Sequence, residues 1–296
     1  MVDFEVNPED IDEIFLDSLN EAYDQWGSRE LYDWSVKRKV GMIESDIILA
    51  RVNGEPAYGA VLYYRNVKTG EGRSFRSCII GDGWTLPKFR GRGLSTIGIG
   101  KGMGIAFERG CSLMIGIGRV NNVSQMNMTV NGGEIVPASY VHVMKGKFIK
   151  NTGLSIKEVD ISPSLLDRLV HLNEREKRGA CHFSYDPPEW ESQFVERPQE
   201  TILLSIEDST FIALERDSNV DRILSVISDG TISFTDAFIT LYQWSGKDVF
   251  HYTSVPGEIE DLKRFEPRIT DGYLALFRSG YLDIEGGWKV HNGDRM

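Results

Sequence analysis

The strongest constraint on this chain is the stretch at residues 85–104, TLPKFRGRGLSTIGIGKGMG, which follows a hydrophobic run. Pro87 ends the preceding strand, because proline has no backbone N–H to donate. Residues 90–93 then lead straight into a helix that starts at Leu94, whose first N–H groups have no internal partner and carry partial positive charge. Glycines let a ligand approach these groups, and arginines add forked donors. The stretch therefore predicts an anion site suited to a pyrophosphate.

Two better-known glycine-rich patterns do not fit this stretch. A phosphate-binding Walker loop needs Ser or Thr after its lysine, and Lys101 is followed by glycine. The dinucleotide fingerprint is absent, because glycines 98, 100, 102 and 104 are evenly spaced by two. Each glycine inside a helix costs about 1 kcal/mol relative to alanine, so we expect them to serve close packing of the helix on a sheet.

The first half of the chain alternates helix and strand patterns. We expect helices at residues 7–23, 28–39, 94–109 and 121–133, and strands within 46–67, 73–86, 112–118 and 139–149. Asn7, Ser28 and either Asn121 or Asn122 are the predicted helix caps. Gly81 and Gly83 interrupt a strand and predict a bulge or a close backbone approach.

The pattern begins again after a boundary at residues 151–165. We expect helices at 162–176, 233–246 and 256–265, and strands within 200–217, 222–230, 248–255 and 272–284. Residues 181–191, CHFSYDPPEWE, have two adjacent prolines and are interpreted as a loop. The repeated order indicates a duplicated α/β fold (α+β, with a mixed sheet), divided into domains 1–152 and 153–296.

Composition narrows the possible partners. The formal net charge of −11 argues against nucleic-acid and anionic-membrane binding, and no apolar run is long enough for a membrane span. The opening sequence has no signal-peptide core, and the three scattered cysteines form neither a disulfide framework nor a metal spacing, so we expect a cytoplasmic protein. The five histidines are isolated in the sequence, and no metal site is predicted.

The strand-Pro-x-x-Arg-Gly-x-Gly-helix arrangement closely resembles the acetyl-CoA pyrophosphate loop of the GCN5-related N-acetyltransferase superfamily. The family pattern Arg/Gln-x-x-Gly-x-Gly/Ala matches residues 90–95, with Ser95 in place of the final Gly or Ala. Downstream, Asn121, Ser124 and Gly132 fall on the Asn, Ala and Gly positions of the family's next helix motif, Asn-x-x-Ala-x-x-x-Tyr-x-x-x-Gly-Phe. The resemblance covers residues 1–150, and a degenerate second copy of the fold is expected after it.

The resemblance implies the acyl-CoA N-acyltransferase fold in two tandem copies, with acetyl-CoA as the acyl donor. In the family, the strand before the loop and the strand after the helix splay apart, and the pantetheine arm sits between them like an added strand. The glycines inside the helix at 94–109 could make room for that arm, which is the alternative to their role in close packing. The cofactor-binding residues carried over are Trp84, Thr85, Leu86, Arg90, Gly91, Arg92, Gly93, Leu94, Ser95, Asn121, Asn122 and Met128.

The catalytic residues are where this sequence departs from the family. The tyrosine that usually protonates the leaving thiolate is replaced by Met128, and the usual Phe after Gly132 is a glycine. Ser124 or Tyr140 could supply the proton, or no acid is needed. Asp82 is the one carboxylate on the strand that leads to the loop, and it is a candidate base or, equally, a bulge residue bonded to nearby N–H groups.

These features predict an enzyme that moves an acetyl group from acetyl-CoA to a primary amine of a small molecule by direct attack. The acidic net charge favours a cationic acceptor such as a polyamine, an amino acid or an aminoglycoside-like amine. A CoA-binding sensor or scaffold without catalysis is the main alternative. Transfer from aminoacyl-tRNA is a third, which the net charge disfavours. We expect a monomer or homodimer.

Overall fold

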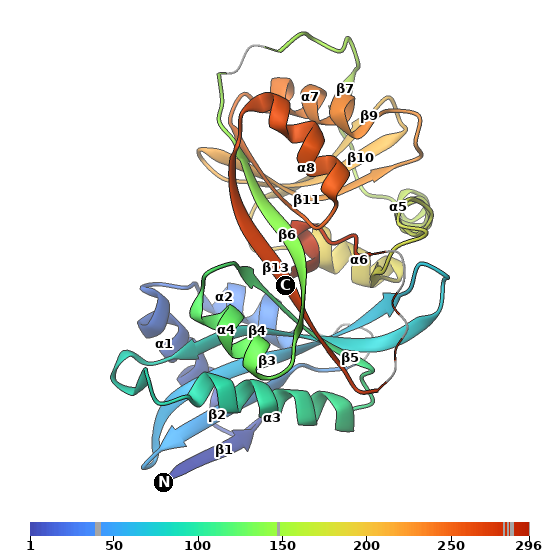
Figure 1. Ribbon diagram of the computed structural model, residues 1–296. Coiled ribbons are helices and arrows are strands. Elements are labelled where there is room, and N and C mark those ends of the chain that lie inside the picture. Colours follow the sequence, from blue (N-terminus) through green and yellow to red (C-terminus); the bar gives the residue numbers. More distant parts are fainter. Residues whose placement is uncertain (39–42, 147–148, 281, 283, 285–286, 296) are drawn as a thin grey trace.

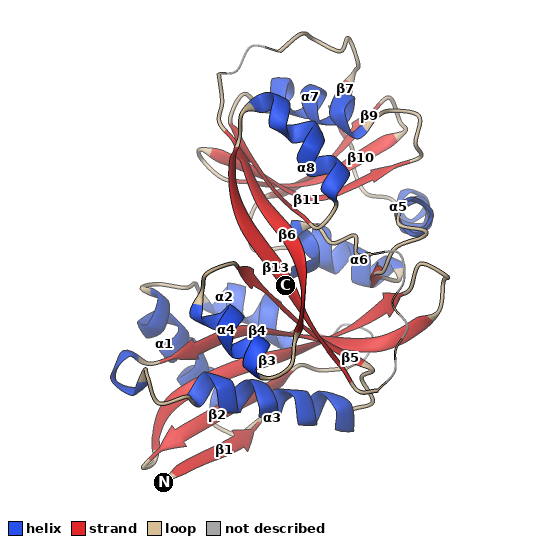
Figure 2. Ribbon diagram, viewed as in Figure 1, coloured by secondary structure: helices blue, strands red, loops and turns tan. Residues whose placement is uncertain are grey.

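The computed structural model describes the whole chain except residues 39–42, 147–148, 281, 283, 285–286 and 296. Its strands form one 13-stranded mixed sheet in the order β1-β2-β3-β4-β5-β13-β6-β12-β11-β10-β9-β7, with β8 paired to β3. Figure 2 shows this sheet running through both halves of the molecule, with helices packed on it. The predicted mixed α/β class is confirmed.

The first half supplies the elements around the predicted loop. They are β1 (Val2–Val6), α1 (Ile11–Tyr23), α2 (Arg29–Tyr32) continued by a π-helical turn (Asp33–Lys37), β2 (Asp46–Val52), β3 (Glu55–Lys68), β4 (Ser74–Thr85), a 3-10 turn (Pro87–Phe89), α3 (Leu94–Glu108), β5 (Leu113–Arg119), α4 (Val123–Val130) and β6 (Glu134–Val143). Strand β1, which pairs with β2, is an element that the sequence analysis did not predict.

The second half repeats much of this order. It contains β7 (Ile156–Glu158), α5 (Pro163–Glu176), β8 (His182–Ser184), α6 (Pro187–Phe194), β9 (Thr201–Ile206), β10 (Thr210–Arg216), β11 (Val220–Ser228), α7 (Phe234–Ser245), β12 (Asp248–Thr253), α8 (Pro256–Leu262) with a 3-10 turn (Lys263–Phe265), β13 (Arg268–Arg278) and a final 3-10 turn (Asn292–Arg295). Strand β13 ends before residues 281 and 283 of the predicted closing strand, and these lie outside the described residues.

Two local predictions were wrong. Asn7 does not cap α1: it has φ 49°, and its side chain bonds Asp46 (2.7 Å) and the N–H of Ile47 (2.7 Å), which ties the turn before α1 to β2. Residues 181–191 are not a loop. Asp186 and Glu189 form a reciprocal capping box, which together with the prolines at the first helical positions starts α6.

The two halves exchange their last strands. Strand β6, from the first half, pairs with β12 of the second half, while β13, from the end of the second half, pairs with β5 of the first. β6 and β13 also pair with each other over nine residue positions, and Figure 1 shows them crossing between the halves. Each half therefore completes its sheet with a strand from the other, and the division at residue 152 stays a prediction.

The core follows the same plan. One buried cluster extends from α1 and the first five strands into α5, α6 and the C-terminal segment, and a smaller cluster lies under α7 and α8. Cys78, Cys111 and Cys181 are buried, and none of them forms a disulfide bond in the structure. None of the described helices has the length and apolar character needed to cross a membrane.

Candidate functional site

Strands β4 and β5 part beside the predicted loop. Their parallel pairing runs from Ser77 opposite Leu113 to Ile80 opposite Gly116 and stops there, although β4 continues to Thr85 and β5 to Arg119. The expected splay is therefore present, and we call the space between residues 81–85 and 117–119 the split. An unpaired strand edge of this kind can accept an extended ligand as an additional strand.

A bulge in β4 sets which groups face the split. The β3–β4 register shifts between Gly59 and Val61, and Asp82 in the bulge has φ 43°. Beyond it, the N–H of Leu86 donates to Ala57 in the β3 direction, at 3.1 Å. Alternation along the strand then turns the backbone groups of Gly83 and Thr85 toward the split. Gly83, which the sequence analysis treated only as a bulge residue, thus joins Thr85 at the open edge.

Both edge carbonyls already accept a side chain. The Tyr23 hydroxyl donates to the carbonyl of Gly83, and Arg90 Nε donates to that of Thr85 at 3.2 Å. The second Arg90 contact goes to the carbonyl of Ala22 at the end of α1, at 3.3 Å. Arg90 therefore ties the loop to α1 and to the end of β4, and each edge carbonyl keeps a second lone pair for a ligand amide.

The predicted pyrophosphate loop has the backbone that such a site requires. Gly91 and Gly93 have φ of 75° and 73°, a region that residues with a Cβ enter only at a cost. Gly93 precedes the first turn of α3, and no side chain caps the helix there. A Cβ added at either glycine would meet nothing within 4 Å, so the approach to the first N–H groups of α3 is open. Arg92 lies beside this opening, over the ring of Phe89 at 5.3 Å.

The glycines inside α3 act in packing. A Cβ at Gly98 would fall 2.1 Å from the ring of Tyr58, and one at Gly102 would lie 3.2 to 3.3 Å from three aliphatic side chains of the sheet. Glycine therefore lets α3 lie directly on β2, β3 and β4, as the packing interpretation predicts. Gly100 faces Asn131 of α4 at 3.2 Å, and Gly104 faces open space.

The sheet has two distinct faces at the split. On the α3 face, Ile80 lies under Gly102 and its partner Gly116 lies under Met128. On the opposite side, which we call the α1 face, Phe15 of α1 packs on Trp84 with ring centroids 5.6 Å apart. Because side chains alternate along a strand, each residue near the split can be assigned to one face.

A phenol and a hydroxyl meet on the α3 face. Ser124 Oγ of α4 lies 3.0 Å from Tyr273 Oη of β13. Tyr273 pairs with Gly118, two residues past the last β4–β5 pair, and a Cβ at Gly118 would lie 2.8 Å from that hydroxyl. Burial raises the pKa of Tyr273 above 10.0, against the opposing effect of its bond to Ser124. The sequence analysis missed Tyr273, which lies 149 residues from Ser124.

Three other residues predicted to bind the cofactor lie around α4. Met128 is buried, with its thioether over Gly116. Asn122 accepts from the Ser124 N–H (3.4 Å) and is the residue that caps α4, while Asn121 has φ 62°.

Asp82 lies on the α1 face. Tyr63, whose ring would contact a Cβ at Gly81, donates its hydroxyl to the Asp82 carboxylate, and the Trp26 side chain also bonds it. Burial raises the pKa of Asp82 above 3.8, and these bonds and the charge of Arg295 reduce that rise. A carboxyl whose pKa is shifted upward is better suited to accept a proton near neutral pH.

Tyr140 is on the α1 face too, so Ser124 does not share a face with the other two predicted catalytic residues. The Tyr140 ring would contact a Cβ placed on Gly272 of β13, and its centroid lies 4.9 Å from that of the Tyr252 ring. Two guanidinium groups rest on it: Arg119 at 5.1 Å, from the end of β5, and Arg295 at 5.0 Å, from the C-terminal turn.

The histidines are not all isolated, which corrects the sequence analysis. His251 Nε2 and His291 Nε2 lie 2.9 and 3.2 Å from the same buried carboxylate, Glu258. The fold brings them together because β12 pairs with the C-terminal segment at Thr253 and His291. This His-Glu-His group has a composition that could hold a metal, but both ring Nδ1 atoms lack a hydrogen-bond partner, unlike the supported histidines of metal sites.

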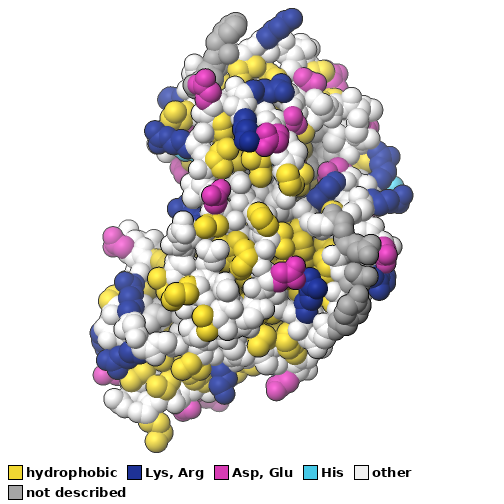
Figure 3. Space-filling model, in the orientation of Figure 1, with side chains coloured by type: hydrophobic (Ala, Val, Ile, Leu, Met, Phe, Trp, Pro, Cys, Tyr) yellow, Lys and Arg dark blue, Asp and Glu magenta, His cyan; other side chains and the backbone are white. Residues whose placement is uncertain are grey.

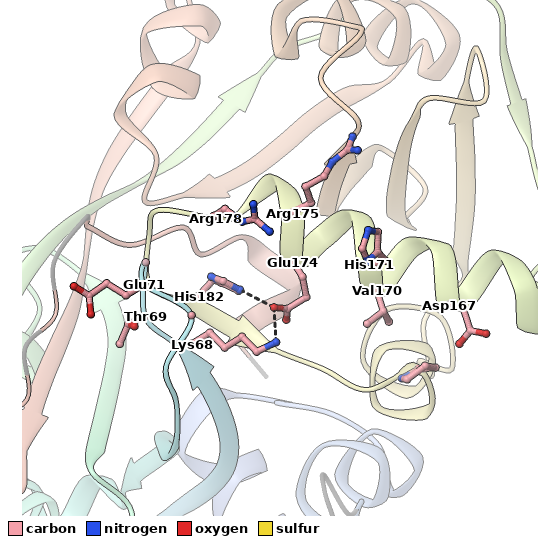
Figure 4. Close-up of a pocket in the computed structure, with 13 residues that line it drawn as sticks. Lys68, Thr69, Glu71, Asp167, Val170, His171, Glu174, Arg175, Arg178 and His182 are labelled. Carbon is pink, nitrogen blue, oxygen red and sulfur yellow. Dashed lines mark hydrogen bonds and ion pairs between the residues drawn. The ribbon is translucent and has the colours of Figure 1, made fainter.

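A separate cavity of about 720 Å³ lies where the β3–β4 hairpin meets α5. Figure 4 shows Lys68 and His182 pointing at Glu174, at 2.6 and 3.5 Å. Burial alone would raise the pKa of Glu174, but bonds from His182, Lys68 and Ser184 lower it to about 2. Lys68 of the first half is thus paired with Glu174 of the second half at this cavity.

Comparison with known proteins places the fold. No protein-family model and no curated protein matches the sequence. Among solved structures, a GCN5-related N-acetyltransferase from Anabaena variabilis has a TM-score of 0.68 and 13% identity, over 93% of this chain and 72% of that one. A tandem GNAT protein from the clavulanic acid biosynthesis pathway gives 0.67 and 10%, over 96% and 100%.

Saccharomyces cerevisiae N-myristoyltransferase, solved with bound myristoyl-CoA, gives a TM-score of 0.66 and 11% identity, over 93% of this chain and 82% of that one. These similarities extend through both halves. The chain therefore has the fold of the GCN5-related N-acetyltransferases in its tandem, two-unit form. At these identities the likeness defines the fold and leaves the reaction to be inferred from the site.

Proposed function

We propose that this protein transfers an acetyl group from acetyl-CoA to a primary amine of a small molecule. The observation that carries the proposal is the continuity of two features: an uncapped helix start behind Gly91 and Gly93, and the open β4 edge at Gly83 and Thr85. With its pyrophosphate at the start of α3 and its extended, amide-bearing arm along the open β4 edge, acetyl-CoA would carry its thioester into the split.

In the proposed reaction the donor and the acceptor use opposite faces of the sheet. The cofactor arrives from the α3 face, since its pyrophosphate site begins that helix. The amine arrives on the α1 face, where Asp82 takes its proton directly or through a water molecule. The amine nitrogen attacks the thioester carbonyl, a C–N bond forms, and the C–S bond of the tetrahedral intermediate then breaks.

Tyr273 replaces the missing family tyrosine in this proposal. The departing thiolate needs a proton, and Met128 has none to give. The Tyr273 hydroxyl lies on the α3 face opposite Gly118, at the open end of the split, with Ser124 Oγ at 3.0 Å to orient it. Its raised pKa keeps the hydroxyl protonated, and so able to donate, before the reaction begins. Tyr140, on the other face, is better placed to contact the acceptor.

The experiment is thiol release from acetyl-CoA in the presence of a panel of amines, with the N-acetyl product identified by mass spectrometry. Release that depends on both enzyme and amine supports the proposal. A CoA-binding sensor remains the second candidate, because Met128 stands where the family has its acid. Tight CoA binding without release for any amine would favour the sensor and reject the transferase.

A further inference from the structure

Arg295 occupies an unusual position on the α1 face of the split. Its guanidinium carbon lies 5.0 Å from the ring centroid of Tyr140 and 4.9 Å from that of Tyr252. Nη1 donates to Asn292 at 3.2 Å, while Nε is buried without a hydrogen-bond partner. Within the described part of the chain it forms no ion pair with a carboxylate. The guanidinium therefore has no direct carboxylate partner, although its charge acts on Asp82 on the same face.

Arg119 brings a second guanidinium to the same ring. It projects from the end of β5 on the α1 face, 5.1 Å from Tyr140, and its guanidinium makes no hydrogen bond or ion pair with any described residue. Two like charges on one aromatic ring repel each other, and an anion held between them would relieve that repulsion.

Arg65 extends the positive region on this face. It is two residues from Tyr63 on β3, so the two side chains share a face, and Tyr63 in turn bonds Asp82. Arg65 is 3% exposed, and its Nε and Nη2 have no hydrogen-bond partner. With the half-buried Arg295 and the exposed Arg119, this gives three arginines on one face in a chain of net charge −11, an arrangement that favours an anionic ligand.

The C-terminal turn holds Arg295 in place. The neighbouring Asp294 is fully buried, accepts from Tyr185 (2.8 Å) and from the N–H of His291 (2.8 Å), and faces the equally buried Lys177 at 3.5 Å. The final turn, Asn292–Arg295, packs against β11, β12 and α6. A side chain fixed by its neighbours in this way is suited to bind a ligand in one orientation.

We propose that the acceptor amine also carries a carboxylate, and that Arg295 and Arg119 bind this carboxylate on the α1 face of the split. This inference rests on the proposed acetyl transfer and names its acceptor class: an amino acid or a similar zwitterion. The planar guanidinium fork matches a carboxylate with two parallel hydrogen bonds. Asp82, on the same face, would receive the ammonium end, whereas a polyamine would meet the arginines with like charge.

The test compares each common L-amino acid with the amine left by its decarboxylation, and adds phosphoethanolamine. Binding is measured as the rise in Tm of the protein saturated with CoA, and turnover as thiol release from acetyl-CoA. We expect at least one amino acid to bind and react about tenfold or more better than its decarboxylated partner, since a charge-assisted contact is lost. Equal response to both partners, preference for phosphoethanolamine, or no binding by any compound overturns the proposal.

Variants assign the effect to the arginines. Arg295→Gln and, separately, the exposed Arg119→Gln should each raise KM for the amino acid about tenfold or more relative to KM for the decarboxylated amine, and leave Kd for acetyl-CoA unchanged. Arg295→Lys keeps the charge and should lose less. Arg73→Gln, which removes a surface arginine on the β3–β4 hairpin, is the matched control. An unaltered preference in both glutamine variants contradicts the proposal.

The two proposals fail in different ways. If amino acids bind with the expected preference but no compound releases thiol, acetyl transfer is rejected and the carboxylate site stands. If thiol is released with equal efficiency from reactions with and without an acceptor carboxylate, acetyl transfer stands and the carboxylate site is rejected.

Discussion

Tyr273 Oη and Ser124 Oγ are 3.0 Å apart, although one residue is on β13, the last described strand, and the other is on α4, which follows β5 in the first half. The exchange of β13 into the first sheet creates this contact. The second half therefore contributes a side chain to the candidate site in the first half. It places the Tyr273 phenol on the α3 face of the split, beside Ser124.

Replacing the Tyr273 hydroxyl tests its role as the acid. Tyr273→Phe should lower kcat about a hundredfold, within the usual range for loss of general acid catalysis, without changing Kd for acetyl-CoA. The rate of thiol release measures kcat, and calorimetric titration measures Kd for acetyl-CoA. The control is Tyr64→Phe, which removes a buried hydroxyl on β3, away from the split, and should leave kcat unchanged. Wild-type kcat in Tyr273→Phe would show that the thiolate leaves without help from this residue.

Asp82 should cost stability at neutral pH. Its folded pKa is raised by burial, so the folded state favours the protonated carboxyl. That preference stabilises the fold at low pH and is lost as pH rises from about 3.9, the unfolded value, through the folded pKa. Asp82→Asn should therefore raise Tm at pH 7, with the gain vanishing near pH 3, while acetyl transfer falls. A lower Tm for Asp82→Asn at pH 7 would contradict this assignment of the pKa shift.

The His251-Glu258-His291 group should make anchoring of the C-terminal segment depend on pH. Glu258 raises the pKa of His291 above 6.5 against the effect of burial, and the histidines hold the pKa of Glu258 well below 4.5. The stabilisation of the fold by His291 is complete below pH 6.5 and is lost as pH rises through the folded pKa of His291. The stabilisation by Glu258 is lost as pH falls below 4.5.

The Tm difference between wild type and His291→Gln should accordingly be largest between pH 4.5 and 6.5 and shrink above it. Melting curves from pH 4 to 9 measure it. His171→Gln is the control, because His171 is solvent-facing on α5 and belongs to no such group. A difference that grows with rising pH would mean that His291 is neutral in the folded protein.

The features that could be predicted from the sequence are those fixed by neighbours along the chain. Gly91 and Gly93 indicate the loop because only glycine adopts their φ readily, and Gly81 and Gly83 flank Asp82 in the predicted bulge. The split follows from the loop, since the resemblance that identifies one includes the other. These parts needed no knowledge of how distant segments meet.

The features that could not be predicted depend on pairing across the chain. Tyr273, Arg295 and His291 all come from the last 24 residues, and nothing local to them indicates that β13 pairs with β5 or that the C-terminal turn reaches Tyr140. Histidines 40 residues apart look isolated until β12 and the C-terminal segment meet. Helix α6 was missed because adjacent prolines usually interrupt a helix. At the first helical positions, where these two lie, proline instead favours the start of one.

Figure 3 shows the surface hollowed between the two halves, with apolar side chains exposed along it. The central claim is that an acyl-CoA enters this junction through the loop at residues 90–95.

The most direct test of that claim is calorimetric titration of acetyl-CoA into wild type, Gly93→Glu and Gly110→Glu. Gly110, at the other end of α3, also has positive φ and open space for a side chain, so its variant carries the same charge and backbone strain. We predict micromolar binding by wild type and by Gly110→Glu, and a loss of about tenfold or more in Gly93→Glu. Equal affinity in all three proteins, or no binding by wild type, would contradict the account.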